Sequence, residues 1–139
     1  MLECRITIPH LTSIAGHRRL LPPAIFQANN KSPFQHAERK YAIYFDYPFH
    51  VIDQITFAIP DGYVVESTPA GHNDTTVNVS RFQTAYRTSP GKIEFQRDFV
   101  INGFFYPVSY YGQLKRIFGT TAGSDAEQLV LIAEASREK

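Results

Sequence analysis

The sequence predicts a mainly β protein, an antiparallel β-sandwich with one short helix near the C-terminus. Short stretches of alternating apolar and polar residues recur along the chain, and turns containing Pro or Gly separate them. Aromatic residues, which favour strands, are abundant: the chain has eight Tyr and eleven Phe. The apolar residues take a helical spacing only between Tyr110 and Phe118. At 139 residues the chain has the length of a single domain, residues 1–139.

The first expected strand runs from Leu2 to Ile8. Its apolar residues occupy every second position, which predicts a strand with one buried face. Cys4 falls in phase with them, so we expect it to be a buried core thiol rather than a nucleophile. Because Cys4 is the only cysteine, an internal disulfide and a cysteine-rich metal site are both excluded.

The stretch from Ile52 to Gly71 predicts two strands joined by a tight turn, which together suggest a hairpin. The turn is Pro60-Asp61-Gly62, where Pro fixes φ and Gly accepts a positive φ. Asp61 could be taken for a catalytic acid. We expect instead that it serves the turn, because Asp bonds readily to its own backbone there.

Further strands are expected on either side of this stretch. Arg39–Phe45 alternates regularly and predicts a strand. Thr75–Tyr86 is also extended, with Val77 and Val79 pointing inward. Its apolar phase then slips, which predicts a bulge or break near Ser80–Arg81.

The last third of the chain changes from strand to helix. Ile93–Ile101 alternates almost without fault, but Arg97 lies on its apolar face. A helix then follows with one apolar stripe, for which Gly119 or Gly123 is the expected cap. Leu129–Ile132 is a short apolar run that we interpret as a final strand, with a second helix as the alternative. The residues of the helical stripe are Tyr110, Leu114, Ile117 and Phe118.

Composition and motifs argue against several classes of function. A net charge of +1 gives no general attraction for nucleic acid. No apolar run approaches the ~20 residues of a membrane-spanning helix, so no membrane insertion is expected. The five histidines show no metal-ligand or catalytic spacing, and we expect no catalytic residues, no metal and no cofactor.

Two aromatic clusters could bind a ligand, and Tyr44, Tyr47 and Tyr111 are the candidates within them. Tyr44 and Tyr111 are the two that we expect to lie off the core face. The alternative is that all of these rings belong to the core and edges of an aromatic-rich sheet. The clusters are Tyr41, Tyr44, Phe45, Tyr47 and Phe49, and Phe104, Phe105, Tyr106, Tyr110 and Tyr111.

The order of several sequence blocks resembles a known family. They are LLPPAIFQANNKSPF from Leu20, ERKYAIYFDYPF from Glu38, ITFAIPDGYVVESTP from Ile55, KIEFQRDFVINGFFYPVSYYGQLKRIF from Lys92 and EQLVLIAE from Glu127. The chain resembles the C-terminal β-rich domain of unknown function that follows the transglutaminase-like core in many bacterial proteins. The family's turn, aromatic helix and final apolar strand match Ile59–Tyr63, Tyr111–Phe118 and Leu129–Ile132.

The resemblance implies a β-sandwich with an accessory role, cut from a longer chain in which a Cys-His-Asp transglutaminase-like domain precedes it. That neighbouring domain is the expected partner, and a cell-envelope or periplasmic location is implied. The nucleophile helix is missing here and Cys4 is misplaced for it, so catalysis is not implied. The resulting hypothesis is a non-catalytic accessory domain. The alternatives are a carbohydrate- or peptide-binding module using surface aromatics, and a hydrolase built from loop His and Asp residues.

Overall fold

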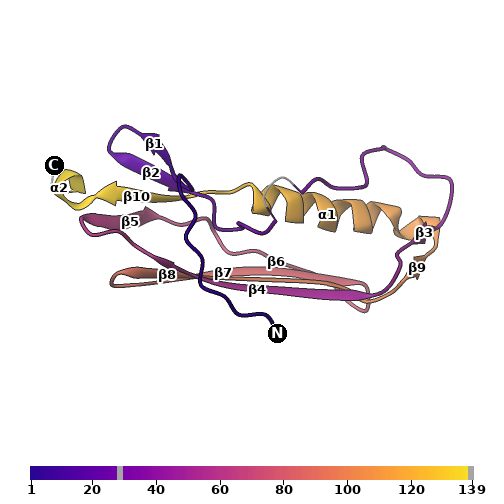
Figure 1. Cartoon of the computed structure of the whole chain (residues 1–139). Coiled ribbons are helices and arrows are strands. Elements are labelled where there is room, and N and C mark those ends of the chain that lie inside the picture. The colour runs from indigo at the N-terminus through magenta and orange to yellow at the C-terminus, as the bar shows by residue number, and fades with distance from the viewer. Residues whose placement is uncertain (28–29, 138–139) are drawn as a thin grey trace.

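The computed structural model describes residues 1–27 and 30–137, which form two stacked layers (Figure 1). One layer is a long sheet of four strands in the order β4-β8-β7-β6. The other layer contains a short sheet, β1-β2-β10-β5, and helix α1, which lie end to end over the long sheet. A two-stranded ribbon, β3-β9, closes the end of the molecule where α1 begins.

All strand pairs are antiparallel, so the predicted mainly β, antiparallel class is confirmed. The strands are β1 (Ser13–Ala15), β2 (Arg18–Leu21), β3 (Ile43–Tyr44), β4 (Phe49–Ala58), β5 (Tyr63–Ser67), β6 (Asn73–Thr76), β7 (Ser80–Ser89), β8 (Lys92–Ile101), β9 (Phe105–Tyr106) and β10 (Leu129–Ala133). The helices are the 3-10 turn η1 (Val108–Tyr110), α1 (Tyr111–Asp125) and α2 (Glu134–Arg137).

The space between the layers holds two hydrophobic cores. The first lies between α1 and the long sheet, where Leu114 and Ile117 of the helix meet Phe82 of β7, all fully buried. The second lies between the two sheets, where Ile93 of β8 packs with Leu129 of β10. Strands β7 and β8 are ten residues long and contribute to both cores, so they join the two halves of the molecule.

The predicted helix is confirmed, with its apolar stripe facing the long sheet. It is longer than expected, because it continues through both glycines that were predicted to cap it. A Cβ at Gly119 or Gly123 would meet nothing within 4 Å, so both positions face open space. The packed face of α1 therefore carries the helix past them, since tertiary packing outweighs the weak helix propensity of glycine.

The predicted hairpin at Ile52–Gly71 is wrong in its pairing. Its two strands exist, but β4 pairs with β8 in the long sheet while β5 pairs with β10 in the short sheet. The Pro60–Gly62 turn carries the chain from one layer to the other, and the amide of Tyr63 donates a hydrogen bond to the Pro60 carbonyl at 3.2 Å. Asp61 is exposed in this turn.

The expected strand at Leu2–Ile8 is also wrong. The segment forms no strand and pairs with no other described strand, and Cys4 is exposed rather than buried. Alternation alone does not bury a face; the segment also needs a strand edge beside it. Likewise, only Ile43–Tyr44 of the predicted Arg39–Phe45 strand is paired, and Tyr41 is 80% exposed.

The region from Thr75 to Tyr86 is broken earlier than the predicted Ser80–Arg81, at the turn of residues 77–79 between β6 and β7. Asn78 adopts a φ of 62° in this turn. Val79 is buried as expected, but Val77 lies at the turn and is 79% exposed, so its predicted inward position is wrong. The final apolar run is confirmed as a strand, because β10 lies between β2 and β5 in the short sheet.

Two glycines give opposite predictions for stability. A Cβ at Gly71 would lie 2.8 Å from the Thr84 carbonyl oxygen, a backbone atom that cannot move aside cheaply. We expect Gly71→Ala to lower the free energy of unfolding by about 1–3 kcal/mol. Gly119→Ala, in open space on the helix, should raise it by about 0.5–1 kcal/mol. Urea unfolding of both variants measures the difference, and equal effects at the two positions would contradict the packing described.

Candidate functional site

The end of the molecule formed by β3 and β9 carries a group of exposed aromatic side chains, which we call the aromatic tip. Tyr44 of β3 and Tyr47 just after it are 71% and 67% exposed, and Phe105 of β9 is 45% exposed. Tyr41 and Phe104 flank the same two strands and are also exposed, at 80% and 60%. The tip therefore consists of Tyr41, Tyr44, Tyr47, Phe104 and Phe105.

The β3-β9 ribbon fixes which rings point outward. Ile43 pairs with Tyr106, and both are buried in the first core. The next pair, Tyr44 and Phe105, must then face the opposite way, because successive side chains of a strand alternate. The Tyr106 hydroxyl donates a hydrogen bond to the Val79 carbonyl at 3.3 Å, which ties the ribbon to the long sheet.

Tyr111, the third candidate aromatic, does not belong to the tip. It is 7% exposed and packs edge-on against Phe34, with ring centroids 5.7 Å apart. Its hydroxyl donates to the His36 carbonyl, which also accepts a hydrogen bond from Lys115 Nζ at 2.8 Å. The expectation that Tyr111 lies off the core face is therefore wrong: its ring anchors the loop before β3 to the start of α1.

The geometry of the tip suits contact with another protein surface. The Tyr44 and Phe105 rings lie 5.0 Å apart and are inclined by 52°, so they form a ridged surface rather than a flat platform. Exposed aromatic side chains that gather in one place are typical of protein interfaces, where they bury a large area at small entropic cost.

A second notable group lies buried at the junction of the two cores. Arg97 of β8 is 3% exposed, and its guanidinium donates to both carboxylate oxygens of Asp125, at 2.7 and 2.9 Å. Asp53 of β4 lies 3.8 Å away on the other side. The guanidinium also lies over the rings of Phe82 and Phe99, at 5.4 and 5.8 Å from their centroids. Arg97 is thus a structural residue that ties α1 to the long sheet.

The titration behaviour of this junction reflects its burial. Burial raises the pKa of the Asp125 carboxyl, in spite of the hydrogen bonds and charge of Arg97 that favour its ionised form. Burial also raises the pKa of the Tyr86 hydroxyl, and the charges of Glu127 and Asp125 add to this effect. Asp125 is buried and paired with Arg97, so its carboxyl has no open path to a substrate.

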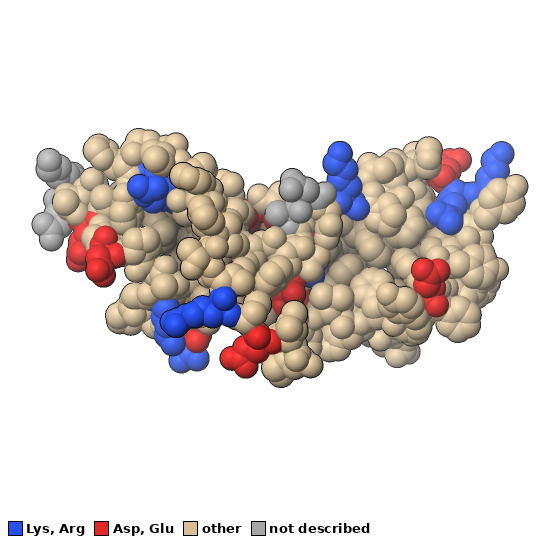
Figure 2. Space-filling model, viewed as in Figure 1, with Lys and Arg blue, Asp and Glu red and all other residues tan. Residues whose placement is uncertain are grey.

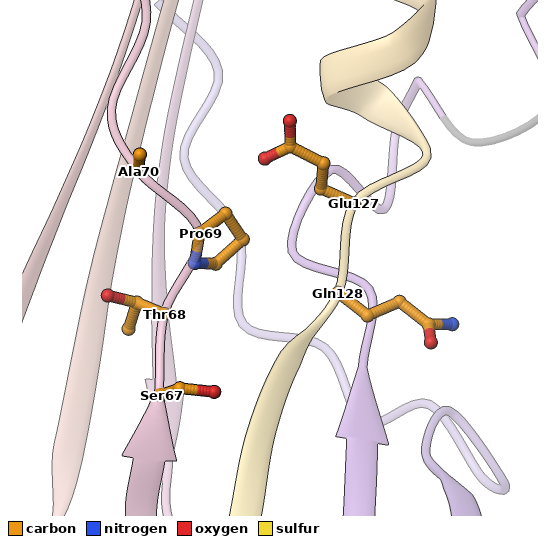
Figure 3. Close-up of a pocket in the computed structure, with 6 residues that line it drawn as sticks. All are labelled: Ser67, Thr68, Pro69, Ala70, Glu127 and Gln128. Atoms are coloured by element: carbon orange, nitrogen blue, oxygen red, sulfur yellow. The ribbon is translucent and has the colours of Figure 1, made fainter.

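An open groove of about 360 Å³ lies beside the junction, where β5 and β10 diverge. Figure 3 shows the Glu127 side chain pointing into the gap towards Ala70, whereas Gln128 points away from it. Glu127 Oε1 lies 2.8 Å from Nε2 of His72, which holds the carboxylate in place. The groove is lined by Ser67, Thr68, Pro69, Ala70, Glu127 and Gln128.

Two of the histidines pair with carboxylates, at separate places in the molecule. His50 lies 2.9 Å from Asp98 Oδ1 on the outer face of the long sheet, whereas His72 contacts Glu127 between the layers. Within residues 1–27 and 30–137, no three His, Cys, Asp or Glu side chains are grouped so that they could hold a metal ion.

The surface charge is mixed. Figure 2 shows basic and acidic residues interspersed over the visible face, with no broad area of one sign. Across the described part of the chain, none of the helices combines the length and apolar character needed to cross a membrane.

Sequence reasoning located part of this arrangement. It named Tyr44 and Tyr47, and both lie in the tip. It placed Tyr41, Phe104 and Phe105 in the aromatic clusters without selecting them, and it selected Tyr111, which is buried. No local turn signal marks this arrangement: the pairing of β9 with β3 continues the antiparallel pairing of β8 with β4, and this places Phe104 and Phe105 beside β3.

Comparison with known proteins places the chain in a family without assigning an activity. Its fold is similar to part of a solved structure from Parabacteroides distasonis ATCC 8503, described as a "putative protease", with a TM-score of 0.61 and 10% sequence identity. The similarity covers 70% of this chain but only 19% of that one. No curated protein matches the chain. Residues 17–131 match the family described as "Domain of Unknown Function with solved-structure structure" (DUF3858), and the chain therefore belongs to this family.

Proposed function

We propose that the chain is a non-catalytic accessory domain that packs against a neighbouring transglutaminase-like domain and helps to present substrate to it. The aromatic tip is the docking surface. The sequence resemblance to the β-rich domain that follows a transglutaminase-like core in bacterial proteins further supports the cell envelope or periplasm as our proposed site of action. The observation that carries the proposal is the exposure of five aromatic side chains on and beside the β3-β9 ribbon, at one end of the molecule.

Two further points support an interaction role. The similar fold from Parabacteroides distasonis makes up 19% of a much longer chain, so in that protein it exists beside other parts. In addition, Tyr44 and Phe105 are held on a paired ribbon rather than a free loop, and a preorganised surface loses little entropy on binding.

The proposal predicts that the tip dominates binding. Tyr44→Ala should weaken binding to the separately produced transglutaminase-like core of the parent protein by about tenfold or more, because buried aromatic anchors contribute over 1 kcal/mol. Isothermal titration calorimetry measures the affinity, with Ile14→Ala as the control. Ile14 is 71% exposed in β1, at the other end of the molecule. Undetectable binding of the unmodified chain to the core would refute the packing.

Carbohydrate or peptide binding by Tyr44 and Tyr47 is the second candidate, because both side chains are free to contact a ligand. The 52° inclination between the Tyr44 and Phe105 rings is a poor fit to the flat face of a sugar. A glycan array and a peptide array test this candidate directly. A hit that is lost in Tyr47→Ala would favour it over docking to a protein domain.

A further inference from the structure

The long sheet has an unprotected edge. Strand β4 is its outermost strand and pairs, among the described residues, with β8 alone. Its ten residues are in unbroken register with β8, without a bulge, and contain no Pro or Lys. Val51 and Ile52 on this strand are 37% and 51% exposed. An edge without these protective features is a template on which another extended segment can pair.

The one charged side chain of β4 that points inward does not protect the edge. Asp53 lies 3.8 Å from Arg97 and accepts a hydrogen bond from Gln27 Nε2 at 3.2 Å. Its charge is therefore compensated within the molecule. An inward charge blocks strand addition only when it would be left unpaired between the new strand and the core.

The same chain contains a segment, residues 2–8, that alternates like a strand but pairs with no strand among the described residues. Leu2, Ile6 and Ile8 are 91%, 50% and 40% exposed, and Cys4 is exposed as well. These residues occupy every second position, as in a strand with one buried face. An apolar face of this kind gains free energy when an edge becomes available to cover it.

The segment enters the domain at one end of β4. Leu11, three residues after Ile8, packs on the second core, as does Phe57 near the end of β4. A segment that runs towards this point from Leu2 has the same direction as β4. If Ile8 lies beside Phe57, then the alternation places each earlier apolar residue beside an inward-facing position of β4. The resulting neighbours are Ile6 and Ile55, Cys4 and Asp53, and Leu2 and Val51.

We propose that residues 2–8 add to the free edge of β4 as a fifth, parallel strand of the long sheet. The addition satisfies the outward-facing amides and carbonyls of β4 and covers Ile55 and Phe57 from the side. This proposed strand addition does not depend on the function proposed for the aromatic tip, because β4 and the tip are different parts of the molecule.

Disulfide trapping tests the position of the strand. In a Cys4→Ser background, the pair Ile6→Cys and Ile55→Cys should oxidise to an intramolecular disulfide, since neighbouring strands place Cα atoms within bridging distance. The matched control combines Ile6→Cys with Thr75→Cys on β6, the opposite edge. We expect the first pair to oxidise at least about tenfold faster, because pairing raises the effective concentration of the two thiols. Mass spectrometry of the unreduced protein distinguishes bridges within one molecule from bridges between two.

Hydrogen exchange provides a second readout in the unmodified chain. Backbone amides among residues 2–8 should exchange at least about tenfold more slowly than in an unpaired chain. Ile6→Asp, on the face to be covered, should abolish this protection, whereas Thr7→Asp on the outer face should retain it. Equal oxidation of both cysteine pairs, bridges only between molecules, or unprotected amides would each overturn the proposal.

Discussion

Arg97→Met is expected to lower the free energy of unfolding by about 3–5 kcal/mol, because it leaves the buried Asp125 carboxylate without its partner. The two side chains are 3% and 4% exposed, so water cannot replace the lost hydrogen bonds. Asp53 would also lose its nearest cation. Such a loss is a large fraction of the stability of a typical domain. Urea unfolding at low temperature, followed by circular dichroism, measures it.

The double variant Arg97→Met, Asp125→Leu separates the loss of a charge pair from the loss of packing. Removing both charges should restore much of the stability lost in Arg97→Met, because no ionised group remains buried at the end of α1. Coupling between the two sites follows from the double-mutant cycle. A cost of less than about 1 kcal/mol for Arg97→Met would show that the pair is not buried in solution.

Phe82→Ala should cost about 3–5 kcal/mol, the usual penalty for removing a fully buried aromatic ring. Phe82 is 0% exposed and packs edge-on against Phe99, with ring centroids 5.9 Å apart. Its ring also supports the Arg97 guanidinium, so the cavity would open next to a charge. Thermal and urea unfolding measure the loss.

Phe105→Ala is the matched control for Phe82→Ala, since it removes the same side chain from the aromatic tip. Phe105 is 45% exposed, and its replacement should change stability by about 0.5 kcal/mol or less. Similar losses for the two variants would be incompatible with the first core lying between α1 and the long sheet.

Much of the fold follows from local patterns in the sequence. The alternation in β8 and the apolar stripe of α1 each reflect the burial of one face of the element. A regular pattern of this kind appears directly in the residue order. Arg97 interrupts that pattern in β8. The residue order showed Arg97 on the apolar face, but not that it is a buried ion-pair partner. Its partner, Asp125, lies 28 residues away and could not be identified from spacing.

The errors concern which segments become neighbours. A Pro-Asp-Gly turn fixes local backbone geometry, but it does not determine whether the next strand pairs back or crosses to the other layer, as β5 does. Cys4 was expected to be buried because its segment alternates, although burial depends on a partner edge. Tyr111 was expected to be exposed, but the loop at Phe34 folds over it. These outcomes depend on contacts distant in sequence.

The continuity of β7 and β8 through both cores has a mechanical consequence. A hinge between the two halves would require breaking ten-residue ladders on both sides of β8, which local opening at a loop cannot achieve. The two halves of the domain therefore move together as one rigid body. Its aromatic tip lies at one end, while α2 and the end of the described chain lie at the other (Figure 1). Whatever is attached at that end is held at a fixed spacing from whatever the tip contacts.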